Sequence, residues 1–130
     1  MEKFKIKIVA LDRLFFEGEA EKIIAATTAG DIGILKNHAD LISNLDFGVL
    51  RIFIDGQEKR AAISKGLITV TKERTSIIAA RCEWTEEIDL ERAHREKAEA
   101  EESIKSARTQ REMDIAEFKL KKAINRINCK

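Results

Sequence analysis

Proline is absent from this 130-residue sequence, and cysteine occurs only twice. Without proline, glycine and Asx residues must make the turns, because they tolerate backbone conformations that other residues avoid. Cys82 and Cys129 lack the paired spacing of a metal site, so we interpret them as free thiols of a reducing cytoplasm, with a disulfide or a zinc site as the alternatives. We expect no metal to be required for folding.

Long hydrophobic runs and an excess of charge are also missing. No segment approaches the roughly 20 consecutive apolar residues that a membrane span needs, and the N-terminus is a charged, alternating run without a signal segment. The 24 lysines and arginines nearly balance the 23 acidic residues, giving a net charge of +1. A nearly neutral chain has no field to attract a polyanion. We therefore expect no nucleic-acid partner, no direct membrane insertion and a location in the compartment where the chain is made.

The hydrophobic pattern changes its period once along the chain. Up to about residue 84 the apolar residues alternate and glycine interrupts them. Beyond the stretch from Ile88 to Ala93 they recur every three or four positions, and glycine is absent. Alternation indicates strands and the longer period indicates helices. The sequence therefore predicts an α+β protein with a sheet domain at residues 1–84 and a helical domain at residues 85–130.

The first domain is predicted to be an antiparallel β-sandwich. Residues 3–8 alternate lysines with apolar side chains, which is typical of a half-buried strand near an edge that the lysines protect. Further short apolar runs follow at close spacing and favour antiparallel strands over strands linked by helices. Asp55-Gly56 is expected to form a type I′ hairpin turn.

The segment from Gly30 to Leu41 needs its own interpretation. Gly30 and Gly33 could let a backbone approach phosphate, but no Lys-Ser/Thr follows as in a phosphate loop. His38 has no serine, cysteine or second histidine at a spacing typical of catalysis or metal binding. A turn with an exposed polar tip and a protein-contact loop remain as interpretations. No nucleophile-base pair elsewhere supports an enzyme.

The second domain is predicted to be two helices or one. Asp89 fits an N-cap, and narrow, alanine-rich apolar stripes follow it. Thr109 to Glu112 has the Thr-x-x-Glu form of a capping box, which would begin a second helix, yet neither glycine nor proline forces a break. An antiparallel hairpin turning near Thr109 and a continuous helix of about 40 residues, roughly 60 Å long, both fit the sequence.

The distribution of charged residues indicates that the chain can adopt the hairpin. Residues 86–102 hold eight acidic and three basic side chains, whereas residues 119–130 hold five basic side chains and no acidic one. Folding at Thr109 lays these segments side by side, which is favourable although salt screens it. The thin stripes bury little surface, so the hairpin should be marginally stable and sensitive to a bound ligand.

A turn near residue 109 also sets a register between the two halves. The expected antiparallel partners are Arg92 with Arg126, Glu96 with Lys122, and Asp89 with Cys129. Arg92, Lys122 and Arg126 would then converge at the open end of the hairpin. Cations that lack enough carboxylate partners are typical of phosphate sites. A solvated charged face is the alternative interpretation.

Taken together, three motifs resemble the epsilon subunit family of bacterial F-type ATP synthases, along essentially the whole chain. Gly30-x-x-Gly33-Ile34-Leu35-x-x-His38-Ala39-x-Leu41 is similar to that family's signature loop. Ser64-x-Gly66-x-x-x-Val70 is similar to its later strand motif, and Ile88-Asp89-x-x-Arg92-Ala93 to the nucleotide-binding motif of many members. The combination and its order are specific, although each motif alone is not.

The resemblance implies a flattened β-sandwich and a helical hairpin in a non-catalytic rotor subunit of the central stalk. The sandwich would bind the gamma subunit and rest on the membrane c-ring, with Asp31 and His38 facing the ring. The helices would either fold onto the sandwich, often holding ATP, or extend into the alpha/beta catalytic head and block ATP hydrolysis. The implied location is peripheral, at the cytoplasmic face of the cell membrane.

The resemblance also assigns a nucleotide site and reveals departures from the family. The residues that map onto the site are Glu83, Ile88, Asp89, Arg92, Ala93, Lys122 and Arg126. Lys122 stands where ATP-binding relatives often carry arginine, so its point charge should hold phosphate less tightly than a bidentate fork would. Lys36 and Asp40 stand where the family usually has prolines, and Lys65 where glycine is common, which changes loop rigidity and contacts but not the fold.

We therefore predict a rotor subunit that couples proton or sodium transport to ATP synthesis. It would inhibit ATP hydrolysis through its C-terminal helices, with ATP as a regulatory ligand. A free-standing β-sandwich binding module with an oligomerising helical tail is the alternative.

Overall fold

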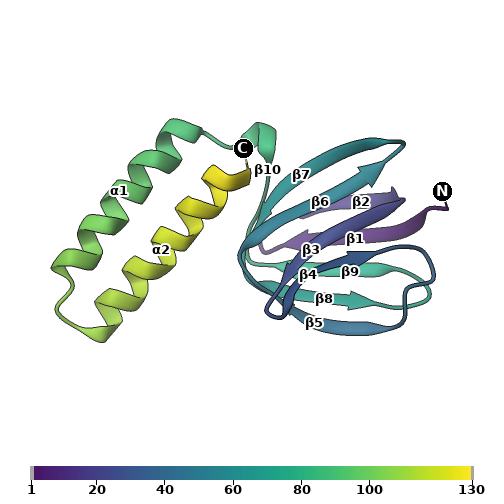
Figure 1. Cartoon of the computed structure of the whole chain (residues 1–130), viewed down its shortest axis with the longest axis horizontal. Coiled ribbons are helices and arrows are strands. Elements are labelled where there is room, and N and C mark those ends of the chain that lie inside the picture. Colours follow the sequence, from purple (N-terminus) through teal and green to yellow (C-terminus); the bar gives the residue numbers. More distant parts are fainter. Residues whose placement is uncertain (1, 130) are drawn as a thin grey trace.

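A computed structural model describes residues 2–129 as a β-sandwich followed by two helices (Figure 1). The strands are β1 (Phe4–Ala10), β2 (Leu14–Ala20), β3 (Lys22–Thr27), β4 (Gly30–Ile34), β5 (Leu41–Leu45), β6 (Gly48–Ile54), β7 (Gln57–Ile63), β8 (Gly66–Val70), β9 (Thr75–Ala79) and β10 (Cys82–Trp84). A 3₁₀ turn, η1 (Thr85–Glu87), leads into the helices α1 (Leu90–Ser106) and α2 (Gln110–Cys129). The predicted α+β class is confirmed.

The strands pair along one path in the order β10-β7-β6-β3-β5-β8-β9-β1-β2, with β4 added against β3. All pairings are antiparallel except that of β1 with β9, which is parallel. The predicted antiparallel sandwich is therefore confirmed apart from this pair. The strand at residues 4–10 lies next to the edge strand β2, not at the edge itself, so its lysines face solvent from an inner strand.

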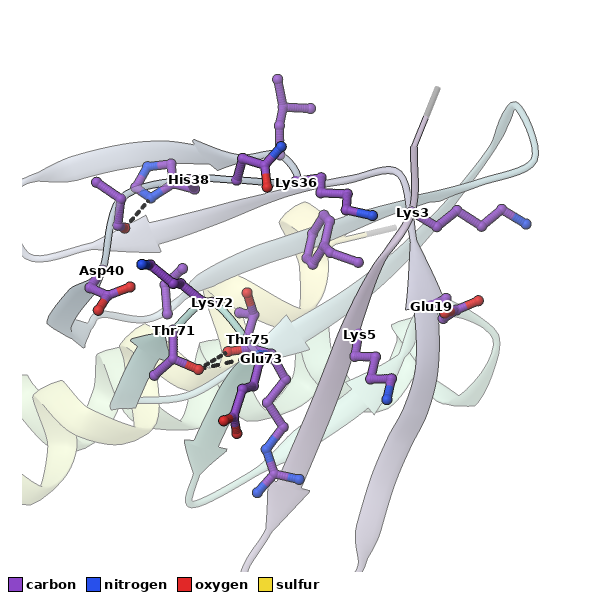
Figure 2. Close-up of a pocket in the computed structure, with 16 residues that line it drawn as sticks. Lys3, Lys5, Glu19, Lys36, His38, Asp40, Thr71, Lys72, Glu73 and Thr75 are labelled. Carbon is purple, nitrogen blue, oxygen red and sulfur yellow. Dashed lines mark hydrogen bonds between the residues drawn. The ribbon is translucent and has the colours of Figure 1, made fainter.

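The segment from Gly30 to Leu41 forms β4, a connection and the start of β5. Gly30 closes the β3–β4 turn with a φ of 116°, and Asn37 turns the connection with a φ of 68°. His38 is half-buried, and its Nδ1 lies 2.7 Å from the carbonyl oxygen of Ala39. Figure 2 shows this connection beside the β8–β9 turn at one end of the sandwich. The geometry is the predicted turn with an exposed polar tip.

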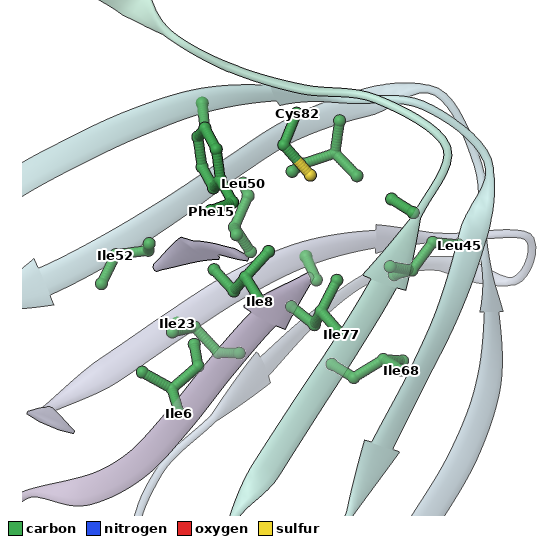
Figure 3. Close-up of a cluster of buried hydrophobic side chains, with 14 of the residues drawn as sticks. Ile6, Ile8, Phe15, Ile23, Leu45, Leu50, Ile52, Ile68, Ile77 and Cys82 are labelled. Atoms are coloured by element: carbon green, nitrogen blue, oxygen red, sulfur yellow. The ribbon is translucent and has the colours of Figure 1, made fainter. Parts of the chain in front are cut away.

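The core is made by alternate side chains that the strands turn inward (Figure 3). The largest fully buried aliphatic residues come from six strands: Ile6, Ile8, Ile23, Ile34, Leu50, Ile52, Ile68 and Ile77. Burying each such side chain contributes about 1.5 to 3 kcal/mol, so these residues are the main source of the sandwich's stability. Every member of this core comes from the sandwich strands.

The two cysteines are buried and unbonded, which confirms the free-thiol interpretation. Burial raises the pKa of the Cys82 thiol to about 12. Burial also raises the pKa of Cys129, against a smaller opposing effect of its hydrogen bond with Thr85. Both thiols are therefore neutral and poorly reactive in the folded chain.

Glycine has a structural role at two positions of the sandwich. Asp55 and Gly56 have φ values of 50° and 79°, as a type I′ turn requires, so the predicted β6–β7 hairpin is confirmed. At Gly66 a Cβ atom would clash with the carbonyl oxygen of Ile78. The strand motif that contains Gly66 therefore needs glycine for the close approach of β8 to β9.

The helices begin where the sequence predicts. Asp89 caps α1, because its Oδ1 accepts a hydrogen bond from the backbone N–H of Arg92 at 3.1 Å. The chain leaves the helix at Ala107, and Thr109 caps α2 by accepting from the N–H of Glu112 at 3.1 Å. The hairpin, one of the two predicted states, is the state of this structure. Its seam is lined by small buried residues: Ala93, Ala100, Ala116 and Ala123.

The hairpin docks on the sandwich through α2, which packs against β6 and β7 (Figure 1). A small buried cluster of Ala62, Ile88 and Cys129 makes the apolar contact. Asn125 adds a hydrogen bond from its Nδ2 to the carbonyl oxygen of Ile63 at 3.1 Å. The docking surface is much smaller than the sandwich core, so polar contacts carry a larger share of its free energy.

Candidate functional site

The site begins on β10, whose three residues pair with β7 at the end of the sandwich. Alternation turns Glu83 and Trp84 to opposite faces of this strand. Trp84 packs on the sandwich core, where its ring stacks on Phe15 with centroids 4.3 Å apart. Glu83 points instead toward α2, where it meets Arg126. A carboxylate of the sandwich is thereby presented to the hairpin.

Arg126 is the central residue of the site. Its side chain is 9% exposed, although it carries a full charge. Its Nε and Nη2 lie 3.1 and 3.2 Å from the two carboxylate oxygens of Glu83. Its Nη1 lies 3.6 Å from Oε2 of Glu96 on α1. The Nε is within ion-pair distance but makes no aligned hydrogen bond, so the guanidinium keeps one unsatisfied donor.

Glu96 is shared between two arginines. Besides its contact with Arg126, it accepts a hydrogen bond from Arg92 Nε at 2.8 Å. Arg92 and Arg126 therefore converge at the open end of the hairpin, as predicted, but through a carboxylate between them.

Across the hairpin Arg126 makes its ionic contact with Glu96, one helical turn along α1 from its predicted partner Arg92. Side chains lean toward the N-terminus of their own helix. In an antiparallel pair that tilt carries Arg126 toward the hairpin turn and Glu96 toward the open end. A count of backbone positions from the turn omits this displacement.

Lys122 lies one turn before Arg126 on α2 and is partly buried. Burial lowers the pKa of its ammonium group, and the Arg81 guanidinium lowers it further. Arg126 also lowers this pKa, whereas Glu96 and Glu83 raise it. Lys122 is thus held among other cations, in a position where an added anion would be favourable.

The three remaining predicted residues have structural roles at the start of α1. Ile88 is 4% exposed and packs in the cluster with Cys129. Asp89 caps the helix, and Ala93 is fully buried in the helix seam. Their predicted contact with a nucleotide stays a prediction.

The structure does not bring Asp31 and His38 together. Asp31 is the second residue of β4, next to the β3–β4 turn, whereas His38 lies beyond the opposite end of that strand. His38 lines a cavity of about 490 Å³ together with Lys72 and Thr75 (Figure 2). The predicted contacts of both residues with a partner stay predictions.

Sequence reasoning missed two residues of the site, Glu96 as the shared carboxylate and Arg81 as a neighbouring cation. Glu96 stands four residues after Arg92, a spacing at which helical side chains meet, so an ion pair between them could have been found. Arg81 comes from the β9–β10 connection, and only the folded chain brings it near Lys122.

The chemistry of this cluster is that of an anion site. Within residues 2–129 no group of histidine, cysteine or acidic side chains could hold a metal ion. Over the same range no helix has the length and apolarity needed to cross a bilayer. Arginine forks and a lysine bind phosphate by charge-assisted hydrogen bonds without performing chemistry on it.

Two family models together match nearly the whole chain. The model described as the ATP synthase delta/epsilon chain β-sandwich domain matches residues 3–85. The model of the long α-helix domain of the same chain matches residues 86–130.

Curated relatives named ATP synthase epsilon chain agree with these models. The one from Ruminococcus albus is 40% identical over 98% of this chain and 96% of its own length. The one from Caldanaerobacter subterraneus subsp. tengcongensis is 40% identical over 95% of this chain and 91% of its own.

Solved structures share the fold. A chain of the Euglena gracilis mitochondrial ATP synthase matches with a TM-score of 0.85 and 21% identity, over 95% of this chain and 78% of its own length. A chain of the Tetrahymena thermophila mitochondrial ATP synthase central stalk and c-ring matches with a TM-score of 0.68 and 13% identity, over 98% and 96%. At these identities the likeness speaks for the fold alone.

Replacing Arg126 by alanine should loosen the hairpin, because it leaves Glu83 and Glu96 without their shared cation. Both carboxylates are partly exposed, so we expect a loss of about 2 kcal/mol, below the usual cost of breaking a fully buried pair, and roughly a 30-fold larger undocked fraction. The measurement is the rate at which a thiol reagent modifies Cys129, which docking buries. Cys82 in the sandwich core serves as internal reference.

Arg95→Ala is the matched control, since Arg95 is an exposed arginine of α1 with no ion pair among residues 2–129. Equal modification rates of Cys129 in the Arg126 variant and the parent chain would show that this ion pair does not hold the hairpin.

Proposed function

The chain belongs to the ATP synthase delta/epsilon family and is a non-catalytic subunit of the central stalk, and from that membership we propose that its helical hairpin is a nucleotide-responsive regulator of ATP hydrolysis. ATP is the proposed ligand. With the hairpin docked the subunit would turn with the rotor, and with the hairpin extended it would enter the catalytic head and inhibit hydrolysis.

The observation that carries this proposal is the place of Arg126. It lies on α2 and contacts a carboxylate of the sandwich and a carboxylate of α1. Within the described residues it is the only ionic link that joins both helices and the sandwich. A ligand that engages Arg126 therefore acts directly on whether the hairpin stays docked.

Glu96 holds the position between two arginines for which a ligand phosphate would compete. It is the carboxylate on which Arg92 and Arg126 both converge. A phosphate chain carries more charge than one carboxylate, so it can replace Glu96 between the two arginines or add to it. Binding to the docked hairpin alone shifts the equilibrium toward docking, by about 2.7 kcal/mol at a ligand concentration of 100 times the dissociation constant.

The sandwich also offers a surface for a rotor partner. Leu67 pairs with Ile78, Ile78 with Val9, and Val9 with Leu14, so four apolar side chains form a row across β8, β9, β1 and β2. Ile78 is 57% exposed and Leu14 is 53% exposed. This row faces outward on strands away from those that carry α2. Exposed apolar rows of this kind mark protein contacts, and the gamma subunit is the partner proposed for it.

The rotor function implies a second contact, with the c-ring, for which Asp31 and His38 are the proposed residues. Asp31 is exposed, and His38 is half-buried within the connection after β4. The proposed location is peripheral, at the cytoplasmic face of the membrane. In this arrangement the subunit would couple proton or sodium movement through the ring to ATP synthesis.

An ATP titration of the full chain by calorimetry tests the ligand. We expect saturable binding that Arg92→Ala and Arg126→Ala weaken at least about tenfold, since each removes a charge-assisted contact to phosphate. Lys122→Arg should bind several-fold more tightly, because a guanidinium adds a second donor to the same phosphate. Arg95→Ala should bind as the parent does. A parent chain that takes up no ATP would remove nucleotide sensing while the stalk role stands.

Changing Ile78 to lysine should weaken association with the gamma-type subunit at least about tenfold, because it removes a buried apolar contact and places an unpaired charge there. The measurement is the affinity of the purified pair. Leu35→Lys, which alters a 46% exposed residue outside the row, is the control. A self-contained homodimer without affinity for such a subunit would instead favour a free-standing module with an oligomerising tail.

Removing residues 89–130 should raise ATP hydrolysis by the reassembled complex, because it removes the proposed inhibitory helices. The sandwich should stay folded, because the main core contains only residues of the sandwich. The measurement is the hydrolysis rate, with circular dichroism to check the fold. An unchanged rate would count against inhibition by the helices.

A further inference from the structure

A cavity of about 310 Å³ lies between α2 and the end of the sandwich. Phe118, Lys122 and Arg126 line it from α2, and Ala62 and Ile63 line it from β7. Among the described residues, α1 contributes nothing to its walls. A molecule bound here would therefore contact the hairpin and the sandwich at once.

The cavity is lined by both apolar and cationic side chains. Phe47 and Phe118 meet edge to face with centroids 5.3 Å apart and form part of its apolar wall. Arg81, Lys122 and Arg126 also line it, with Glu83 as the one carboxylate of the lining. This excess of cations, together with the buried Arg126 whose Nε lacks a hydrogen bond, indicates an anion as occupant.

The backbone of Arg81 is held by two hydrogen bonds with Ser64. Its backbone N–H donates to Ser64 Oγ at 2.9 Å, and its carbonyl accepts from the Ser64 N–H at 3.0 Å. Ser64 is 8% exposed, so the backbone of Arg81 is held against a buried residue. Its guanidinium has no ion pair within residues 2–129.

We propose that Arg81 is a phosphate-binding residue, which reaches from the sandwich into this cavity and takes the polyphosphate chain of a nucleoside triphosphate together with Lys122 and Arg126. The proposal rests on the nucleotide role proposed above and adds a ligand group that belongs to the other domain. It also gives Ser64, from the strand motif Ser64-x-Gly66-x-x-x-Val70, a positioning role through the backbone of Arg81.

The placement has a consequence for selectivity. Lys122 offers phosphate only a point charge. The guanidinium of Arg81, in addition to that of Arg126, can supply the two parallel donors that a lysine lacks. A longer phosphate chain can form ion pairs with more of the three cations than a shorter one can. Arg81 should therefore matter more for a triphosphate than for a diphosphate, and it should make binding depend on the hairpin being docked.

Calorimetry of the full chain with ATP and with ADP tests this role. We expect Arg81→Ala to lower ATP affinity about tenfold, as the loss of one charge-assisted hydrogen bond would. Its ADP affinity should fall less, so the preference for ATP over ADP shrinks. Arg81→Lys should lie between the parent and Arg81→Ala. ATP should also protect Cys129 from a thiol reagent in the parent chain but less at equal ATP in Arg81→Ala.

The matched control is Arg74→Ala, which removes an exposed arginine from the β8–β9 turn, outside the lining of this cavity. Unchanged ATP affinity and unchanged preference in Arg81→Ala, with binding still lost in Arg126→Ala, overturn the role of Arg81 and leave the proposed function intact. Failure of the parent chain itself to bind ATP overturns both, so the two failures are distinguishable. Thermal unfolding checks that each variant is folded.

Discussion

The arrangement of the two domains depends on one buried guanidinium. The side chain of Arg126 is only 9% exposed, and it can be buried because carboxylates approach it from two directions, Glu83 from the sandwich and Glu96 from α1. A buried charge that loses its partners is strongly unfavourable, whereas the same charge in water costs nothing. The hairpin is thus fastened to the sandwich by an interaction that another anion can replace, which a purely apolar contact would not permit.

Much of the fold follows from local signals in the sequence. Alternation identified the strands, Asp55-Gly56 the hairpin turn, and Asp89 and Thr109 the starts of the helices, because each depends on residues close in the chain. The parallel pairing of β1 with β9 could not be predicted, since it joins segments about 70 residues apart and no local feature encodes it. For the same reason the sequence did not connect Arg81 with Lys122.

The sequence indicated which residues gather at the candidate site better than it indicated which of them touch. Lys122 and Arg126 were placed at the open end from helix register, and the structure puts them there beside Glu83. The ionic contact of Arg126 falls on Glu96, one turn along α1 from the predicted Arg92, because side-chain tilt was left out of the prediction. Asp89 illustrates a different limit, because its carboxylate is engaged in capping α1, and the sequence alone could not decide between capping and ligand binding.

The alanine seam between the helices bears on how the chain behaves when the hairpin opens. The fully buried residues of this seam are Ala93, Ala100, Ala116 and Ala123, and each of them buries only a single methyl group. Separating the helices therefore uncovers little apolar surface, and it leaves two strongly charged helices in water. Such a segment can leave its docked position and stay soluble without a chaperone or an immediate new partner. The same weak packing that makes the hairpin marginal also protects the opened chain from aggregation.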